Sequence, residues 1–250
     1  FPFDIHTGGI DHREIHHPNE IAQNQAFCGC AGLSDATNSG ARIWMHNNFL
    51  VERSGKMSKS AGEFLRLQLL LDKGYHPLAY RMMCLQAHYR SELEFSWDGL
   101  GAALTRLKRM VMQAERLKDA EAGDPSHPKF APLLDKFEAA IADDLNTAIA
   151  LTAFEEALAV KKVDAGVKRA VIERMDEVLG LGLMELTREQ LRVRPKDAAI
   201  DEATIEARLA ARVDARKAKD FATSDAIRDE LAAAGVEVMD GDQLGWEWKL

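Results

Sequence analysis

The sequence of 250 residues is poor in cysteine and has no long apolar run. Its three cysteines, at positions 28, 30 and 84, cannot build a disulfide framework and fit a reducing compartment. No apolar run approaches the ~18 residues that cross a bilayer, and no signal-peptide pattern opens the chain. The sequence therefore predicts a cytoplasmic protein without a membrane span. Its composition, 46% apolar and 29% charged, is typical of globular proteins.

The sequence also lacks an overall excess of positive charge, since its formal net charge is −8. This argues against indiscriminate binding to nucleic acid, although a local basic surface can still bind RNA. Such a surface is indicated by Arg208, Arg212 and Arg216, which recur every four residues and so share one helix face. That face could lie along a phosphate backbone, or it could be a solvated face paired with Glu206 and Asp214. Charge alone does not decide between these two roles.

Two tryptophans near the end of the chain, Trp246 and Trp248, are separated by one residue. Aromatic rings of this kind can stack on exposed RNA bases. They can equally pack against the last pair of helices, so the spacing by itself does not decide between the two roles.

The pattern of apolar residues changes along the chain. Residues 1–66 mix short apolar segments with Gly, Asn and His, and they predict a strand ending at Ile5, a helix from Pro18 to about Gly32, and a strand from Arg42 to Glu52. Strand, helix and strand in this order indicate an α/β layer. From residue 64 onward the spacing is almost wholly helical, and it ends in a small unit of two helices and a strand.

A phosphate-binding loop is suggested by the five residues Lys56-Met57-Ser58-Lys59-Ser60, which follow Gly55. Two lysines and two serines on a flexible loop could grip a polyphosphate while charge develops on a leaving pyrophosphate. A solvated charged turn has the same composition. The pentapeptide alone does not separate these alternatives.

A dense group of imidazoles and carboxylates lies near the start of the chain. Its members fall within 15 residues: His6, Asp11, His12, His16, His17 and Glu20. His16 and Glu20, spaced i and i+4, are candidate zinc ligands, but tetrahedral zinc needs four. Cys28 and Cys30 have a poor chelating spacing. The alternative is a polar loop whose histidines satisfy one another.

Several segments, in one order, resemble cysteinyl-tRNA synthetase, a class I aminoacyl-tRNA synthetase. They are Asp4–Asp11, His16–Gln23, Trp44–Asn47, Lys56–Ser60, His88–Ser91, Phe95–Ser96, Asp144–Thr147, Lys219–Ala222 and Ser224–Arg228. The likeness spans nearly the whole chain, and several motifs in one order make coincidence improbable.

The resemblance implies roles for these residues. His16 and Glu20 match two of four ligands of a Zn²⁺ ion that recognises the thiolate of cysteine. Lys59 matches a lysine that contacts ATP, with Lys56 beside it as a second catalytic residue. Further ATP-binding residues match in the first segment (Gly8, Gly9 and Asp11) and in the third (His46). ATP would bind with Mg²⁺. The tRNA for cysteine would bind through Arg208, Arg212, Arg216 and Trp246.

The resemblance also implies a fold: a partial Rossmann-type α/β fold, an all-α bundle and a small α+β unit that binds tRNA. The expected domains are residues 1–66 (the C-terminal half of a class I catalytic domain), 67–122 (helical stem contact), 123–190 (helical bundle) and 191–250 (anticodon-region binding). The chain departs from the family in lacking the His-x-Gly-His signature and in carrying Pro18, Asn48 and Glu63.

These points predict the C-terminal portion of a monomeric cysteine–tRNA ligase, whose other zinc ligands lie before Phe1. Alone, the chain should bind tRNA weakly and not activate cysteine. Two alternatives remain. One is a noncatalytic synthetase-like paralogue that binds RNA, and the other is a ligase that joins cysteine to an amino-sugar inositol.

Overall fold

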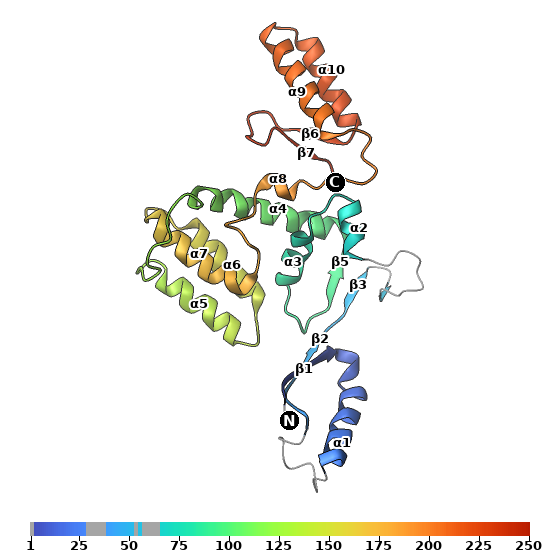
Figure 1. Ribbon diagram of the computed structural model, residues 1–250, viewed down its shortest axis with the longest axis vertical. Helices are drawn as coiled ribbons and strands as arrows, with labels where there is room; N and C mark the ends of the chain where they lie inside the picture. The colour runs from blue at the N-terminus through green and yellow to red at the C-terminus, as the bar shows by residue number, and fades with distance from the viewer. Residues whose placement is uncertain (1–2, 29–38, 53–54, 57–65) are drawn as a thin grey trace.

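A computed structural model describes residues 3–28, 39–52, 55–56 and 66–250, with only the backbone described at positions 28, 52, 55 and 56. The chain is elongated, with an N-terminal unit at one end, a helical bundle in the middle and a C-terminal unit at the other end (Figure 1). No helix within the described ranges combines the length and the apolar character that crossing a membrane requires.

The N-terminal unit is a β-α-β arrangement. It contains β1 (Phe3–Gly9), the short 3-10 helix η1 (Ile10–His12), α1 (His16–Cys28) and β2 (Ala41–Asn47). The two strands are parallel, from Phe3 opposite Ala41 to Gly9 opposite Asn47. Parallel strands need a crossover, and α1 supplies it. The helix begins at His16, two residues before the predicted start at Pro18. A larger Rossmann-type fold stays a prediction.

The single strand predicted from Arg42 to Glu52 is wrong, because the chain changes partners at Asn48. The Asn48 N–H donates to the Tyr89 carbonyl (2.8 Å), and its side-chain amide donates to the Arg90 carbonyl (3.0 Å). A second sheet begins there, with the order β4-β3-β5. Its strands are β3 (Leu50–Glu52), β4 (Gly55–Lys56, antiparallel to β3) and β5 (Leu93–Phe95, parallel to β3).

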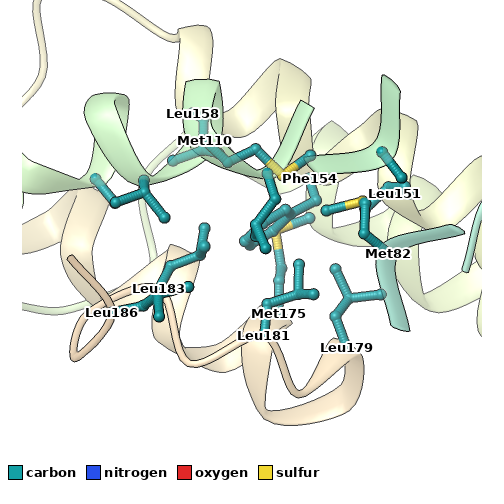
Figure 2. Packing of buried hydrophobic residues seen from close by; sticks show 14 of the residues in the cluster. Met82, Met110, Leu151, Phe154, Leu158, Met175, Leu179, Leu181, Leu183 and Leu186 are labelled. Carbon is teal, nitrogen blue, oxygen red and sulfur yellow. The ribbon is translucent and has the colours of Figure 1, made fainter. Parts of the chain in front are cut away.

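Helices form the middle of the molecule. They are α2 (Leu67–Asp72), α3 (Pro77–Leu85), α4 (Trp97–Ala114), the 3-10 helix η4 (Glu115–Leu117), α5 (Ala131–Ala142), α6 (Thr147–Ala159), α7 (Ala165–Leu179) and α8 (Arg188–Leu191). One continuous hydrophobic cluster extends through them from Leu70 to Leu191. Phe154 and Leu151 of α6 meet Met82 of α3 and Met175 of α7 inside it (Figure 2). The two regions expected at 67–122 and 123–190 therefore share one core.

Local signals in the sequence set the ends of these helices. The Asn146 side chain accepts a hydrogen bond from the Ile149 N–H, which confirms the predicted cap of α6. Ser96 caps α4 through Gly99, and Asp164 caps α7. Gly180 ends α7 with a φ of +62°, a left-handed conformation that glycine adopts without strain. Capping therefore places the helices where the apolar spacing predicts them.

The C-terminal unit has a small core of its own. It contains α9 (Glu202–Lys217), α10 (Phe221–Ala233), β6 (Val236–Val238) and β7 (Trp246–Trp248). The two strands pair antiparallel. The predicted pair of helices and the strand that follows them, β6, are confirmed. The second strand, β7, was not predicted from the sequence. The core of the C-terminal unit comprises Ile205, Ile227, Leu231, Val236, Trp246 and Trp248.

Candidate functional site

The carboxylate of Glu20 connects α1 to the first strand. One oxygen lies 2.8 Å from Nε2 of His6 on β1, and the other lies 3.0 Å from Nε2 of His16, one turn earlier in α1. The i, i+4 pairing of His16 and Glu20 expected from the sequence is therefore present. Glu20 in addition reaches a strand histidine that the sequence did not single out as a ligand.

His17 is the buried centre of the cluster, with only 2% of its surface exposed. Its Nδ1 lies 2.8 Å from Nε2 of His46 on β2, so one ring donates a hydrogen bond to the other. Burial lowers the pKa of His17, and the neighbouring His6 and His46 lower it further. Both effects oppose a positive charge and outweigh the opposite effect of Glu20, so they favour the neutral imidazole. Neutral imidazole is the form that ligates metals.

The small size of Gly8 makes room for this histidine. A Cβ atom at Gly8 would lie 2.7 Å from Cε1 of His17, which is closer than packing allows. Gly8 also lies opposite His46 in the parallel register, so Gly8 and His46 both border His17. At Gly9, an added Cβ would lie 2.5 Å from Oδ1 of Asp11. These four predicted ATP-binding residues thus lie together near the carboxyl ends of β1 and β2.

Three side chains are arranged closely enough to share a metal ion. A nitrogen of His6, a nitrogen of His17 and a carboxylate oxygen of Glu20 all lie within 4.8 Å of one another. Two imidazoles and a carboxylate are a normal donor set for zinc, so the residues fit such an ion. His16 joins this group through Glu20. The cluster also holds a buried donor, Nε1 of Trp44, which has no hydrogen-bond partner among the described residues.

A signal for His6 and His17 was present in the sequence. Alternate residues of a strand face the same side, so His6 and Gly8 share one face of β1. A glycine two positions after a histidine leaves a space on that face, and His17 fills it. What the sequence could not show is which of the adjacent histidines, His16 or His17, turns inward.

The lysine loop is largely outside the described residues. Lys56 lies in β4, where its backbone pairs with Val51, and its side chain is not described. Lys59 and Glu63 fall between residues 57 and 65, outside the described ranges. The predicted catalytic roles of Lys56 and Lys59 therefore stay predictions.

The basic face of α9 is present, and its arginines pair with acids of the same unit. Arg208 pairs with Glu230 of α10. Arg212, 5% exposed, donates to both oxygens of Asp240 (2.6 and 2.8 Å), and Arg216 lies 3.3 Å from the same carboxylate. The hydrogen bonds from Arg212 lower the pKa of Asp240. Arg212 is thus occupied within the fold, while half of the Arg216 side chain is exposed.

The prediction that Trp246 stacks on RNA is wrong, because its side chain is fully buried. Its Nε1 donates to Glu206 (2.7 Å), and Arg192 covers its ring with the guanidinium 3.7 Å from the centroid. The alternative role, packing against the last helix pair, is the one observed. The exposed aromatic residue of this unit is Phe221, 62% exposed at the start of α10. The Asp220 cap before it is the signal that places it there.

Comparison with known proteins matches both ends of the chain. Residues 1–105 match the family described as the tRNA synthetases class I (C) catalytic domain, and residues 202–244 match the cysteinyl-tRNA ligase anticodon binding domain. The protein class that these matches define is the class I aminoacyl-tRNA synthetases. The cluster of imidazoles and Glu20 lies within the first matched segment.

The family follows from relatives that align with the whole chain. A cysteine–tRNA ligase of Novosphingobium aromaticivorans is 72% identical over 252 residues, covering 100% of this chain and 51% of the relative. Those of Zymomonas mobilis and Burkholderia lata are 50% and 40% identical, covering 99% and 95% of this chain and 53% and 46% of theirs. The chain belongs to the cysteine–tRNA ligase family, and it spans about half the length of the curated relatives it matches.

Replacing the bridging carboxylate tests the metal site. Glu20→Gln should weaken zinc binding at least about tenfold, because it removes a charged donor and loosens His6 and His16. Competition with a chromophoric chelator measures the affinity. Glu14→Gln is the matched control, because Glu14 is exposed and, within the part of the chain that the structure describes, pairs only with Arg13. Equal affinities for both variants would show that Glu20 does not hold the ion.

Proposed function

We propose that this chain is part of an enzyme that activates cysteine with ATP and transfers it to the tRNA for cysteine. The observation that carries the proposal is the Glu20 cluster at the carboxyl ends of the parallel strands β1 and β2. In open α/β folds, ligands bind in the crevice at these ends. The family matches at the two ends of the chain support the same conclusion.

The cluster accounts for selection of cysteine. A zinc ion held by Glu20 and by imidazoles among His6, His16 and His17 would supply a soft Lewis acid that prefers a thiolate to a hydroxyl. Glu20 fixes the orientation of both His6 and His16 through its two oxygens. Such a site discriminates against serine by far more than an apolar pocket can, since an apolar pocket rejects an isosteric hydroxyl only weakly.

ATP is proposed to bind, with Mg²⁺, beside this cluster. The nucleotide would be bordered by Gly8, Gly9, Asp11 and His46. Because Gly9 has no side chain, the ligand could approach its backbone closely. Lys56 and Lys59 would stabilise negative charge on the α-phosphate and pyrophosphate as the cysteine carboxylate attacks. The attack forms the carboxyl–phosphate bond and releases pyrophosphate. The residues contribute position and charge, and none forms a covalent intermediate.

The tRNA is proposed to bind along the C-terminal unit. Arg208 and Arg216 retain exposed side chains, 39% and 50%, that could contact phosphates. Phe221 offers a ring for stacking on an unpaired base. Arg212 would act indirectly, because its pairing with Asp240 orients the segment after β6. The proposal includes a monomeric enzyme in the cytoplasm.

Removing the exposed ring tests the tRNA surface. Phe221→Ala should weaken tRNA binding by about 1–3 kcal/mol, or about 5- to 150-fold, because base stacking on an aromatic side chain is lost. Filter binding at fixed salt measures the affinity, and a thermal melt checks the fold. Phe27→Ala, at an 89% exposed ring on α1, is the matched control. Unchanged affinity in Phe221→Ala would remove this residue from the interface.

The activity itself is tested in the complete protein that carries this chain. We expect pyrophosphate exchange that depends on cysteine and not on serine, together with cysteinylation of tRNA. Lys59→Ala should lower the exchange rate about 10²–10³-fold, because one charged donor to the phosphates is lost. Lys161→Ala, at an exposed lysine far along the chain, is the control. Exchange without tRNA charging would favour an amino-sugar inositol ligase, and neither activity would favour the noncatalytic paralogue.

A further inference from the structure

The C-terminal unit and the helical bundle have separate hydrophobic cores. The bundle core ends at Leu191, and the core of the C-terminal unit comprises residues of α9, α10, β6 and β7. Among the described residues the two clusters have no member in common. Figure 1 shows α8 and α4 lying next to the β6–β7 hairpin, where the two units meet. The attachment must therefore depend on other interactions.

Charged side chains bridge the two units. The basic side chains belong to the bundle, and the acidic side chains belong to the C-terminal unit. Lys108 of α4 pairs with Glu247 of β7. Arg188 of α8 donates to both oxygens of Asp242 (2.8 and 2.9 Å) and lies 3.4 Å from Glu247. We call Lys108, Arg188, Asp242 and Glu247 the charged junction. Its complementarity specifies one orientation of the hairpin against the bundle.

Partial burial strengthens the charged junction. The side chains of Lys108, Arg188 and Glu247 are only 17%, 17% and 15% exposed. Exposed ion pairs contribute little because water and salt screen them, and pairs removed from water are screened less. Arg192 adds a contact of another kind, since it donates to the Trp246 carbonyl (3.2 Å) and covers the Trp246 ring. The basic side chain of Arg192, from the bundle side, thus reaches the core of the C-terminal unit.

The rest of the boundary is incompletely packed. A hollow of about 620 Å³ lies beside the Arg188–Asp242 pair, and its lining also includes Met112, Arg116 and Gln243. A second hollow, of about 530 Å³, lies between Trp97 and Trp248. The direct contacts near this second hollow are small: the Lys196 N–H donates to the Asp72 carbonyl (2.8 Å), and Leu250 lies against Gly74. Loss of the charged junction would leave few contacts to hold the angle between the units.

We propose that the charged junction positions the tRNA-binding end of the molecule relative to the catalytic end. This inference rests on the proposed function, because the angle between the C-terminal unit and the bundle sets where a bound tRNA lies. Lys108, Arg188, Asp242 and Glu247 are positioning residues that contact neither ATP nor cysteine. Breaking the junction should therefore impair use of tRNA and leave cysteine activation intact.

The test is a double-mutant cycle in the complete protein, with Lys108→Met, Glu247→Gln and the combination. Each single variant should raise KM for tRNA about fivefold, since a coupled pair at a boundary has an effect of this order. The combination should be no worse than Glu247→Gln alone, because that change already breaks the pairs of Glu247 with Lys108 and Arg188. Cysteine-dependent pyrophosphate exchange should not change in any of the three. Small-angle scattering should show a broader distribution of shapes for each variant than for the wild type.

A matched control is the pair Lys136 and Glu156, which joins α5 to α6 inside the bundle. Lys136→Met and Glu156→Gln should alter neither KM for tRNA nor the scattering. Additive effects of the two junction variants, unchanged scattering, or an equal loss of pyrophosphate exchange would each overturn the inference. Absence of any tRNA binding by the wild type would instead overturn the proposed function, and the scattering would still report whether the junction holds the two units.

Discussion

The continuous apolar core of the bundle is the constraint on which the arrangement of the molecule depends. It extends from Leu70 to Leu191 and fixes α3, α4, α6 and α7 against one another. Both ends of the molecule attach to this body through polar contacts. At one end, Asn48 hydrogen-bonds to the loop at Tyr89 and Arg90, and at the other, the charged junction holds the hairpin. In the proposed function, this rigid centre would relate the tRNA-binding end of the molecule to the catalytic end.

The sequence predicted the helical part of the fold well. Apolar spacing and caps such as Asn146 are local signals, and the helices lie where those signals place them. It predicted strands less well, because strand ends depend on distant partners. The break at Asn48 follows from a hydrogen bond to Tyr89, 41 residues away, and β7 exists only because it pairs with β6. Neither partner can be identified from local spacing.

The same distinction separates the site residues that the sequence could bring together from those that it could not. His16 and Glu20 are one helical turn apart, so local geometry is enough to place them together. His6 joins them across a strand and a helix, and recognising it required the tertiary structure. Composition could not decide whether Trp246 or Phe221 is exposed. Burial of Trp246 against Glu206 and Arg192 decides it, and it moves the candidate stacking residue to Phe221.

In the proposed function, the Glu20 cluster helps to hold a metal ion that binds the sulfur of cysteine. X-ray absorption at the zinc edge of the complete protein tests it most directly. If the cluster does so, nitrogen and oxygen ligands from this chain should be present in the free protein, and one further sulfur ligand should appear at about 2.3 Å when cysteine is added. Serine should produce no such change. A zinc environment that cysteine leaves unaltered would show that the metal does not bind the sulfur of the substrate.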